Sequence, residues 1–371
     1  MGSVRGRSRV TPTVDGCAPS AATAVGGVAS VHYDFGQAGG SMDSGQATVG
    51  ITIRGVATDA DFDAMSWIQA ACRVADGFDT ARSGEQFRDG LGQSPGVVHE
   101  EQFRLAFAGD AAVGYAYGMT DGEDEDEGRV LWHEGLVLPE WRGRGIGRRL
   151  LAEAQDAARR HGDRRFGPAG SRVRFRAMVS EQAESARRLL LHDGYAVVRY
   201  GFSMVRPTLA DPPPDALPAG LEARPATRET AMQILRATDD AFRDHWGFPD
   251  MTDEDRAAWI DHPVMGQLDV WQVAWDGDEV AGGVLGFINE PENEQLGRKR
   301  GYTEVIFTRR QWRGRGLATA LIGRNLRLLA ERGMTEAALS VDAENPSGAL
   351  ALYQKVGFEV RKTTVIFERP A

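Results

Sequence analysis

Arg142-Gly143-Arg144-Gly145-Ile146-Gly147 follows the apolar run Gly135-Leu136-Val137-Leu138 and opens a stretch with apolar residues at helical spacing. The chain contains a second version of this passage. Arg313-Gly314-Arg315-Gly316-Leu317-Ala318 follows Val305-Ile306-Phe307-Thr308 and again leads into a helical pattern. A short apolar run followed by such a pattern predicts a strand and then a helix. Both passages therefore predict the order strand, basic glycine-rich loop, helix, and this order decides the fold.

The glycine-rich loops have the composition of an anion site. Glycine has no Cβ, so its amide can approach a ligand closely and its φ can be positive. The first turn of a helix leaves N–H groups unpaired, and the helix dipole adds partial positive charge there. The alternative is a tight turn with solvated arginines, and the second copy in the same context favours a phosphate site. Neither loop is a Walker loop, because no Gly-Lys-Ser/Thr follows, and the glycine spacing does not suit a dinucleotide fingerprint.

The composition excludes several classes of function. A net charge of −10 makes nucleic acid an unsuitable partner. No apolar run reaches the roughly 20 residues of a membrane span. Cys17 and Cys72 are too few for a disulfide framework or a cysteine metal site, so we expect free thiols, no metal and a cytoplasmic protein. Residues 1–47 are rich in Gly, Ala, Ser and Thr and are expected to form a disordered extension.

The chain repeats one plan. The offsets between matching landmarks are similar: 170 from Arg54 to Arg224, 171 from Arg142 to Arg313, and 163 from Gly194 to Gly357. Such offsets indicate duplication. We expect a first domain over residues 48–206, a proline-rich linker over 207–220 and a second domain over 221–371. Helices alternate with strands and antiparallel hairpins, which predicts an α/β (α+β) fold.

Several boundaries follow from the local pattern. We expect strands at residues 195–205 and 358–367 to close the first and second domains, respectively. One strand is expected at 302–308, after a polar loop at 289–300, and a helix at 346–356. The six acids between residues 121 and 128 are expected to form a solvated hairpin tip.

The pattern Arg-x-x-Gly-x-Gly/Ala after a strand resembles the acetyl-CoA loop of the GNAT superfamily of N-acetyltransferases. The resemblance implies that backbone amides of the loop hold the diphosphate of CoA and that the preceding strand runs beside pantetheine. It also implies two tandem GNAT-like domains, each with a mixed, mostly antiparallel sheet that splays open at the cofactor. The implied cofactor-binding residues are Phe307, Thr308, Arg313, Gly314, Arg315, Gly316, Leu317, Ala318 and Thr319 in the second copy, and Val137, Arg142, Gly143, Arg144, Gly145, Ile146 and Gly147 in the first.

A second motif distinguishes the two copies. Asn345, Ala349, Tyr353 and Gly357-Phe358 resemble the GNAT pattern Asn-x-x-x-Ala-x-x-x-Tyr-x-x-x-Gly-Phe. The resemblance implies that the Asn345 side chain bonds pantetheine and that the Tyr353 hydroxyl protonates the departing thiolate. The spacing of four places the three residues on one helix face, and tyrosine is a credible proton donor to a thiolate. The alternative is a core role for Tyr353.

The corresponding residues of the first copy are Gln182, Ala186 and Leu190. Leu190 cannot donate a proton, so we place catalysis in the second domain and expect the first domain to be structural or to hold cofactor without turnover.

Acetyl transfer to an amine also needs a base. The GNAT resemblance implies a Glu on the strand before the loop, and Glu304 occupies that place, with an exposed strand carboxylate as the alternative. The first copy has His133 there, beside Glu134.

The expected acceptor wall lies between the first two helices of the second domain. Aromatic residues would line it, and acids would attract a cation. The alternative is a capped helix break with solvated acids. The proposed substrate-binding residues are Asp244, His245, Trp246 and Glu290, with Phe248, Glu292 and Glu294 nearby.

The sequence thus predicts an N-acetyltransferase that moves an acetyl group from acetyl-CoA directly to a primary amine of a small molecule. Two GNAT copies with the active site in the second resemble the architecture of the mycothiol synthases. An acetyltransferase for aminoglycoside-like antibiotics and an acetyl-CoA-binding sensor or scaffold without turnover stay open as alternatives.

Overall fold

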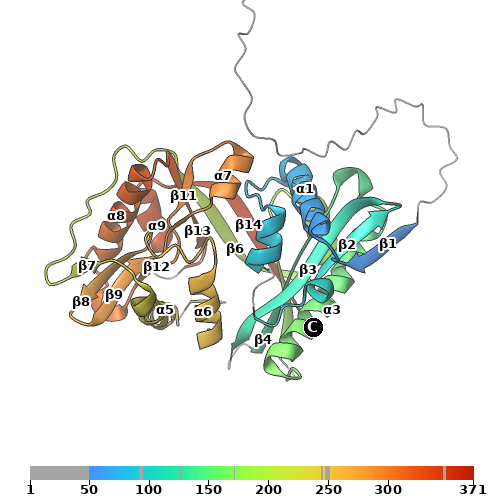
Figure 1. Cartoon of the computed structure of the whole chain (residues 1–371), viewed down its shortest axis with the longest axis horizontal. Coiled ribbons are helices and arrows are strands. Elements are labelled where there is room, and N and C mark those ends of the chain that lie inside the picture. Colours follow the sequence, from blue (N-terminus) through green and yellow to red (C-terminus); the bar gives the residue numbers. More distant parts are fainter. Residues whose placement is uncertain are drawn as a thin grey trace, which may run out of the picture. The chain divides into compact units, whose positions relative to one another are not determined.

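The computed structural model describes residues 50–91, 95–124, 128–170, 172–243, 245–246, 251–345 and 348–371. The expected extension at 1–47 and part of the acidic hairpin tip, residues 125–127, lie outside these ranges. Two sheets with helices packed on them make up the described chain (Figure 1).

The first repeat has the expected alternation of strands and helices. Thr58 begins its first helix in a capping box, and Gly77 ends that helix in a left-handed conformation. The elements are β1 Ile51–Gly55, α1 Asp59–Asp76, the π-helical turn η1 Gln86–Leu91, α2 His99–Gln102, β2 Phe103–Ala108, β3 Ala111–Asp124, β4 Gly128–Val137, the 3₁₀ turn η2 Pro139–Trp141, α3 Ile146–Phe166, β5 Val173–Ser180, α4 Glu184–His192 and β6 Ala196–Arg206.

The second repeat follows the same plan. Thr227 and Thr252 start its first two helices by accepting hydrogen bonds from the N–H groups of Thr230 and Asp255. The elements are β7 Glu222–Arg224, α5 Arg228–Phe242, α6 Asp253–Asp261, β8 Gln272–Asp276, β9 Glu279–Val284, β10 Phe287–Ile288, α7 Glu290–Leu296, β11 Arg300–Tyr302, β12 Ile306–Thr308, the 3₁₀ turn η3 Arg310–Trp312, α8 Leu317–Glu331, β13 Glu336–Asp342, α9 Ala349–Lys355 and β14 Glu359–Pro370.

Two expected elements differ from the structure. The polar segment 289–300 contains a helix, α7, because the Asn289 side chain accepts a hydrogen bond from the N–H of Glu292 and caps it. The strand expected at 302–308 is broken into β11 and β12, with Val305 at a φ of 45° in the break. A β-branched residue with positive φ is strained, and apolar periodicity gives no sign of such a break.

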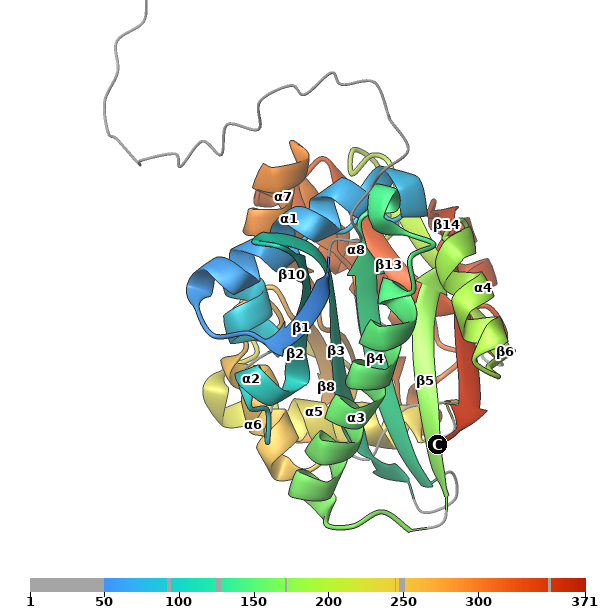
Figure 2. The same cartoon turned by 90° about the vertical axis from the view of Figure 1, so that its right-hand side faces the viewer.

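The two repeats exchange their last strands. The large sheet has the order β1-β2-β3-β4-β5-β14-β6-β13-β11-β10, and the small sheet has the order β12-β9-β8-β7. Thus β14 pairs with β5 of the first repeat (Figure 2). Likewise, β6 pairs with β13 of the second repeat. The expectation that residues 195–205 close their own domain is wrong, because apolar alternation defines a strand but not its neighbour.

The pairing of the two exchanged strands reflects the duplication. Gly201 in β6 lies opposite Thr364 in β14, and their numbers differ by 163, the offset that separates Gly194 from Gly357. The two repeats are therefore related by a local twofold axis that passes between Gly201 and Thr364 at the centre of the sheet.

The core lies on the face of the central strands that α3, α4, α8 and α9 cover. In the first repeat, Phe175 and Val365 pack with Leu190 of α4. In the second repeat, Met204 and Leu339 pack with Leu321 of α8. Alternate residues of these strands point to the opposite face, which leaves that face to line the sites described below.

The strand exchange predicts that a change in β14 destabilises the first repeat. Phe367 is fully buried in β14 among residues of β5, α3 and α4. Phe367→Ala is expected to lower the free energy of unfolding by about 3–5 kcal/mol because it leaves a cavity. Hydrogen exchange followed by mass spectrometry checks the location of the effect. Protection should fall in β5, whereas loss of protection confined to the second repeat would contradict the exchange.

Candidate active site

The break between β11 and β12 opens the sheet. The N–H of Thr303 donates to the carbonyl of Ala338 at 2.8 Å, which continues the pairing of β11 with β13. Beyond it the chain turns away, and β12 pairs with β9 in the small sheet. A slot therefore forms between β12 and β13. In the first repeat, β4 pairs with β5 only as far as Trp132 and Arg176, so the same two strands splay there.

Glu304 lies at the point where the slot begins. Because β11 has left the ladder, the N–H of Ser340 in β13 would lose its partner, and Glu304 Oε1 accepts from it at 2.9 Å. Burial raises the pKa of Glu304 to about 8, although the hydrogen bond from Ser340 opposes this rise. A carboxyl group with such a pKa can exchange a proton near neutral pH.

The glycine-rich loops have the conformation that their sequence predicts. Gly314 and Gly316 have φ of 74° and 83°, and Gly143 and Gly145 have φ of 73° and 79°. Gly316 caps α8 and Gly145 caps α3, with no side chain bonded to either helix start. The first N–H groups of both helices therefore remain available to an anion.

Two glycines with the same φ allow the effect of a Cβ on stability to be distinguished from its effect on ligand binding. Gly316 and Gly333 share a φ of 83°, and a Cβ at either would meet no atom within 4 Å. Gly316→Ala and Gly333→Ala should each lower the free energy of unfolding by about 1–2 kcal/mol. Only Gly316→Ala should raise the Kd for acetyl-CoA, measured by calorimetry, because Gly333 follows the far end of α8. An equal rise in both variants would contradict a ligand role for the loop.

The first arginine of each loop fixes the loop to its strand. Arg313 Nε donates to the carbonyl of Thr308 at 2.9 Å, and Arg142 Nε donates to the carbonyl of Val137 at the same distance. Arg142 also forms an ion pair with Asp76 at 2.7 Å. These two arginines position the backbone, which leaves the backbone amides as the candidate binding groups of the loops.

A cavity of about 520 Å³ brings most of the second-copy predictions together. Tyr353 lines it and is almost fully buried, and its ring packs against Phe358. Burial raises the pKa of Tyr353 above its usual range, and the nearby charge of Glu304 raises it further. The predicted residues that line this cavity are Glu304, Phe307, Thr308, Arg313, Gly314, Gly316, Leu317, Ala318, Thr319, Asn345, Tyr353 and His245.

Asn345 reaches the cavity by a different route from the one expected. Helix α9 begins at Ala349, after Gly348 with a φ of 73°, so Asn345 precedes the helix and does not share its face with Tyr353. Both residues nevertheless line the same cavity. The expected helix start was too early because Gly348 adopts a left-handed conformation that a helix cannot contain.

The expected acceptor residues are placed differently. His245 lines the cavity, whereas Trp246 stacks on Arg176 at 4.2 Å and on Arg199 at 4.9 Å. Glu290 is exposed at the start of α7, away from the cavity lining. Arg315 is exposed as well and does not line it. Asp244 and Phe248 lie outside the described residues.

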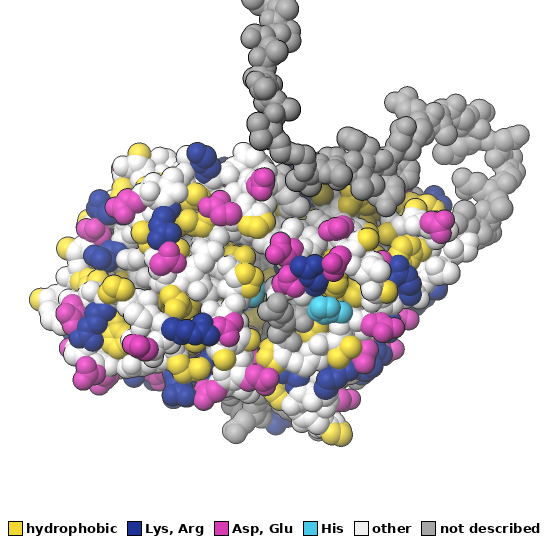
Figure 3. Space-filling view, in the orientation of Figure 1, with side chains coloured by type: hydrophobic (Ala, Val, Ile, Leu, Met, Phe, Trp, Pro, Cys, Tyr) yellow, Lys and Arg dark blue, Asp and Glu magenta, His cyan; other side chains and the backbone are white. Residues whose placement is uncertain are grey.

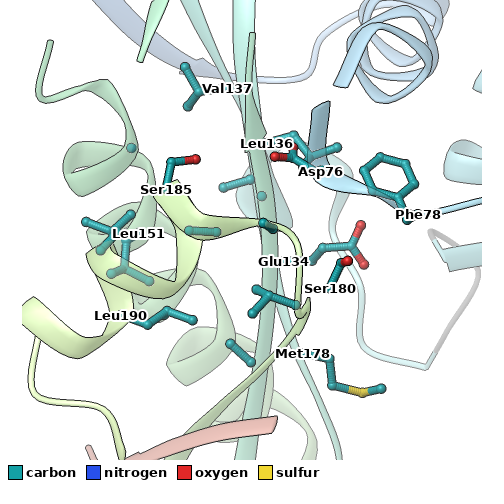
Figure 4. A pocket seen from close by; sticks show the side chains of 18 of the residues that line it. Asp76, Phe78, Glu134, Leu136, Val137, Leu151, Met178, Ser180, Ser185 and Leu190 are labelled. Atoms are coloured by element: carbon teal, nitrogen blue, oxygen red, sulfur yellow. The ribbon is translucent and has the colours of Figure 1, made fainter. Parts of the chain in front are cut away.

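A second cavity of about 870 Å³ lies at the equivalent place in the first repeat (Figure 4). Leu190 stands where the second repeat has Tyr353 and is only 4% exposed. Figure 4 shows Leu151 and Leu190 on the side of α3 and α4, and Glu134, Ser180 and Met178 on the other side. Of the first-copy predictions, Val137, Arg142, Gly143, Gly145 and Gly147 line this cavity, whereas Arg144 stacks on Trp141 and Ile146 is in the core.

In the first repeat, the two candidate bases, His133 and Glu134, form hydrogen bonds with other side chains of the protein. His133 Nε2 and the Tyr195 hydroxyl are 2.6 Å apart, and burial lowers the pKa of His133 to about 4. The Tyr117 hydroxyl donates to Glu134 at 2.6 Å, and Arg82 donates to Glu134 at 3.3 Å. Sequence reasoning missed Arg82 and Tyr117, because neither belongs to a motif and only the fold brings them to Glu134.

The surface charge, the side-chain clusters and the helices of the described residues do not indicate another kind of site. Basic and acidic side chains alternate over the face in Figure 3, without a large field of one sign. Within the described ranges, no group of three or more His, Cys, Asp or Glu side chains could hold a metal ion. No helix in the described part of the chain is long and apolar enough to cross a membrane.

Comparison with known proteins connects this geometry to a family. The model of the Acetyltransferase (GNAT) family matches residues 63–169 and 231–358, one match in each repeat. Two similar curated proteins are both named mycothiol acetyltransferase. The one from Nocardiopsis dassonvillei is 29% identical and covers 81% of this chain and 90% of its own length. The one from Tsukamurella paurometabola is 31% identical and covers 76% of this chain and 91% of its own length.

Solved structures share the architecture. A GCN5-related N-acetyltransferase from Sphaerobacter thermophilus has a TM-score of 0.66 and 27% identity, over 86% of this chain and 95% of that chain. A tandem GNAT protein from the clavulanic acid biosynthesis pathway has a TM-score of 0.62 and 18% identity, over 86% of this chain and 98% of that chain, and supports the fold alone. The chain therefore belongs to the GNAT acetyltransferase family, as a tandem GNAT acyltransferase whose family uses acetyl-CoA as the acetyl donor.

Proposed function

We propose that the second repeat transfers the acetyl group of acetyl-CoA directly to a primary amine of a small molecule. The observation that carries this proposal is the convergence of Glu304, Tyr353 and the loop of Gly314 and Gly316 on one cavity. Glu304 takes a proton, Tyr353 gives a proton, and the loop holds the diphosphate.

The proton steps follow from the two side chains. Glu304 takes a proton from the acceptor ammonium, which frees the nitrogen lone pair to attack the thioester carbonyl. The C–N bond forms, and the C–S bond of the resulting tetrahedral species then breaks. Tyr353 gives its proton to the departing thiolate, and the second proton of the nitrogen restores the Tyr353 hydroxyl. The products are therefore the neutral amide and free CoA thiol, with one proton left on Glu304. The raised pKa of Tyr353 keeps this hydroxyl protonated until the C–S bond breaks and the thiolate forms.

The acceptor is proposed to be a small amine without several positive charges. Curated relatives are named mycothiol acetyltransferase, which supports a small-molecule acceptor. An aminoglycoside-like polycation would need an acidic wall, but Glu292 is buried against Arg298 and Tyr302, and Glu290 does not line the cavity. Asp342 lines the cavity but is ion-paired with Arg199. These pairings support the first proposal over the antibiotic alternative.

The first repeat is proposed to hold acetyl-CoA without turnover. Its loop has the same glycine conformations, but Leu190 supplies no proton and Glu134 is bonded to Arg82 and Tyr117. Calorimetry should give two acetyl-CoA molecules per chain, and Gly145→Ala should weaken one of them without lowering kcat. A parallel loss of kcat would contradict this division of roles.

The central test measures thiol release from acetyl-CoA with a panel of primary amines. Release should require both the amine and the second cavity. If the protein binds acetyl-CoA tightly and no amine causes release, the transfer proposal is wrong and a cofactor-holding role replaces it.

A further inference from the structure

A polar strip connects the two cavities across the centre of the large sheet. In one row, Lys362 of β14 lies opposite Ser203 of β6, and Ser203 lies opposite Ser340 of β13. The alternate residues Met204 and Leu339 point into the core under α8. Lys362, Ser203 and Ser340 therefore lie on the face away from α3, α4, α8 and α9. We call this row the acceptor strip.

The strip runs from the proposed base to the larger cavity. Ser340 lines the cavity of the second repeat, and its N–H bonds Glu304. Ser203 and Lys362 line the cavity of the first repeat. The residues that line the two cavities therefore meet at the neighbouring strands β6 and β13. Two strand spacings separate Ser340 from Lys362, a backbone distance of about 10 Å. A small molecule whose amine lies at Glu304 can therefore extend over Ser203 to Lys362.

Comparison of the two repeats shows which partner Lys362 lacks. The residue at the matching place in the other repeat has an ion pair with an acid, and Lys362 has none within the described ranges. Arg199 matches Lys362 at the offset of 163, and Arg199 forms an ion pair with Asp342 at 2.8 Å. Asp342 lies opposite Gly201, and the matching pair in the other half is Ser180 opposite Thr364. The first repeat therefore has serine where the second has the acid.

Lys362 is accordingly a cation without an ion pair among the described residues. Its charge, with those of Arg300 and Arg298, helps to lower the pKa of Asp79. Asp79 already accepts from Arg300 at 2.9 Å and forms a longer ion pair with Arg298 at 3.5 Å. The pairing of β14 with β6 shifts register between Val360 and Lys362, and such bulges commonly turn a side chain toward a site.

We propose that Lys362 determines acceptor specificity by binding an anionic group of the acceptor amine. This inference rests on the proposed transfer in the second repeat and adds the substrate class. The acceptor carries a primary amine at one end and a carboxylate or phosphate at the other. Ser203 supplies a hydroxyl between the two ends, and Lys362 holds the anionic end at the border of the first-repeat cavity, away from the glycine-rich loop that is proposed to hold acetyl-CoA.

The test compares amines of matched length that end in a carboxylate, a phosphate or a hydroxyl. Loss of a charged hydrogen bond is worth about 1.5–3 kcal/mol, so Lys362→Met should raise KM for the two anionic amines roughly 10- to 100-fold. The values of kcat and of KM for acetyl-CoA should not change, and neither should KM for the hydroxyl amine. Lys299→Met, which removes an exposed lysine before β11, is the matched control and should change none of these values.

Binding without turnover keeps this inference separate from the transfer proposal. Calorimetry with CoA-loaded protein should show tighter binding of the anionic amines than of the hydroxyl amine, and Lys362→Met should abolish the difference. Preference for the carboxylate or for the phosphate identifies the anion. Equal binding of all three amines by the unmodified protein, or an equal effect of Lys362→Met on all three, overturns the inference. Selective binding without thiol release would leave the subsite intact and count against transfer alone.

Discussion

Tyr353→Phe is expected to lower kcat by roughly 10²- to 10⁴-fold, the usual contribution of a positioned proton donor. The substitution removes one oxygen from a nearly buried ring, so packing against Phe358 should survive. The Kd for acetyl-CoA should stay within about twofold, because the loop of Gly314 and Gly316 supplies the main binding groups. Pre-steady-state thiol release and calorimetry on the same preparation check the two expectations.

The control for this variant is Tyr200→Phe, which removes a hydroxyl from a partly exposed ring on β6 outside both cavities. Its kcat should equal that of the unmodified protein. If Tyr353→Phe lowers kcat less than about threefold while binding is unchanged, the thiolate is protonated by another group, and Tyr353 has the core role that the sequence left open.

The loops and the candidate acid were predictable because their chemistry is local. Glycines with positive φ at a helix start are indicated by residue type alone, and Gly314 and Gly316 have that conformation. The placement of Tyr353 on the same cavity followed from a motif a few residues long. Such features depend on neighbours in sequence, which a single chain displays directly.

The acceptor strip was not predictable from the sequence. Ser203 and Lys362 belong to strands that are expected to close different domains, and only the exchange of β6 and β14 places them side by side. The acids near residue 290 show the limit of reading charges from sequence. They suggested attraction of a cation, but Glu292 accepts hydrogen bonds from Arg298 and Tyr302 within the fold. Composition reveals charges, whereas only tertiary structure shows which charges are already paired.

The two halves have diverged at the positions that matter for turnover. Leu190 stands where the second repeat has Tyr353, the proposed proton donor, and Ser180 stands where the second repeat has the ion-paired Asp342. Under the proposed roles, the first difference leaves one slot without a proton donor, and the second leaves Lys362 without an ion pair in the described part of the chain. Both differences fit the proposal that one repeat performs the chemistry and that the other contributes to the acceptor subsite.

Glu304→Gln is expected to change activity and stability in opposite directions. The base acts when it is deprotonated, so kcat/KM of the unmodified protein should rise through an apparent pKa of about 8. The variant, measured with the same amine, should lack this rise and should be about 10²- to 10⁴-fold slower at pH 8, where the acceptor is still an ammonium. Above the pKa of the acceptor the amine is already neutral, so the rate loss should shrink there. A rate loss that high pH does not relieve would count against a simple base role.

Stability gives an independent measurement of the same group. Because burial raises the pKa of Glu304 from 4.5 to about 8, the folded state holds this proton more tightly than the unfolded state. The charged Glu304 carboxylate therefore destabilises the folded state. This destabilisation is absent below pH 4.5, grows between pH 4.5 and 8, and is complete above pH 8. Glu304→Gln should therefore unfold with a free energy higher by a few kcal/mol at pH 9 and nearly unchanged at pH 4. Glu331→Gln, an exposed change at the end of α8, should show no such pH-dependent gain, and a gain of equal size in both variants would mean that burial of Glu304 is not its cause.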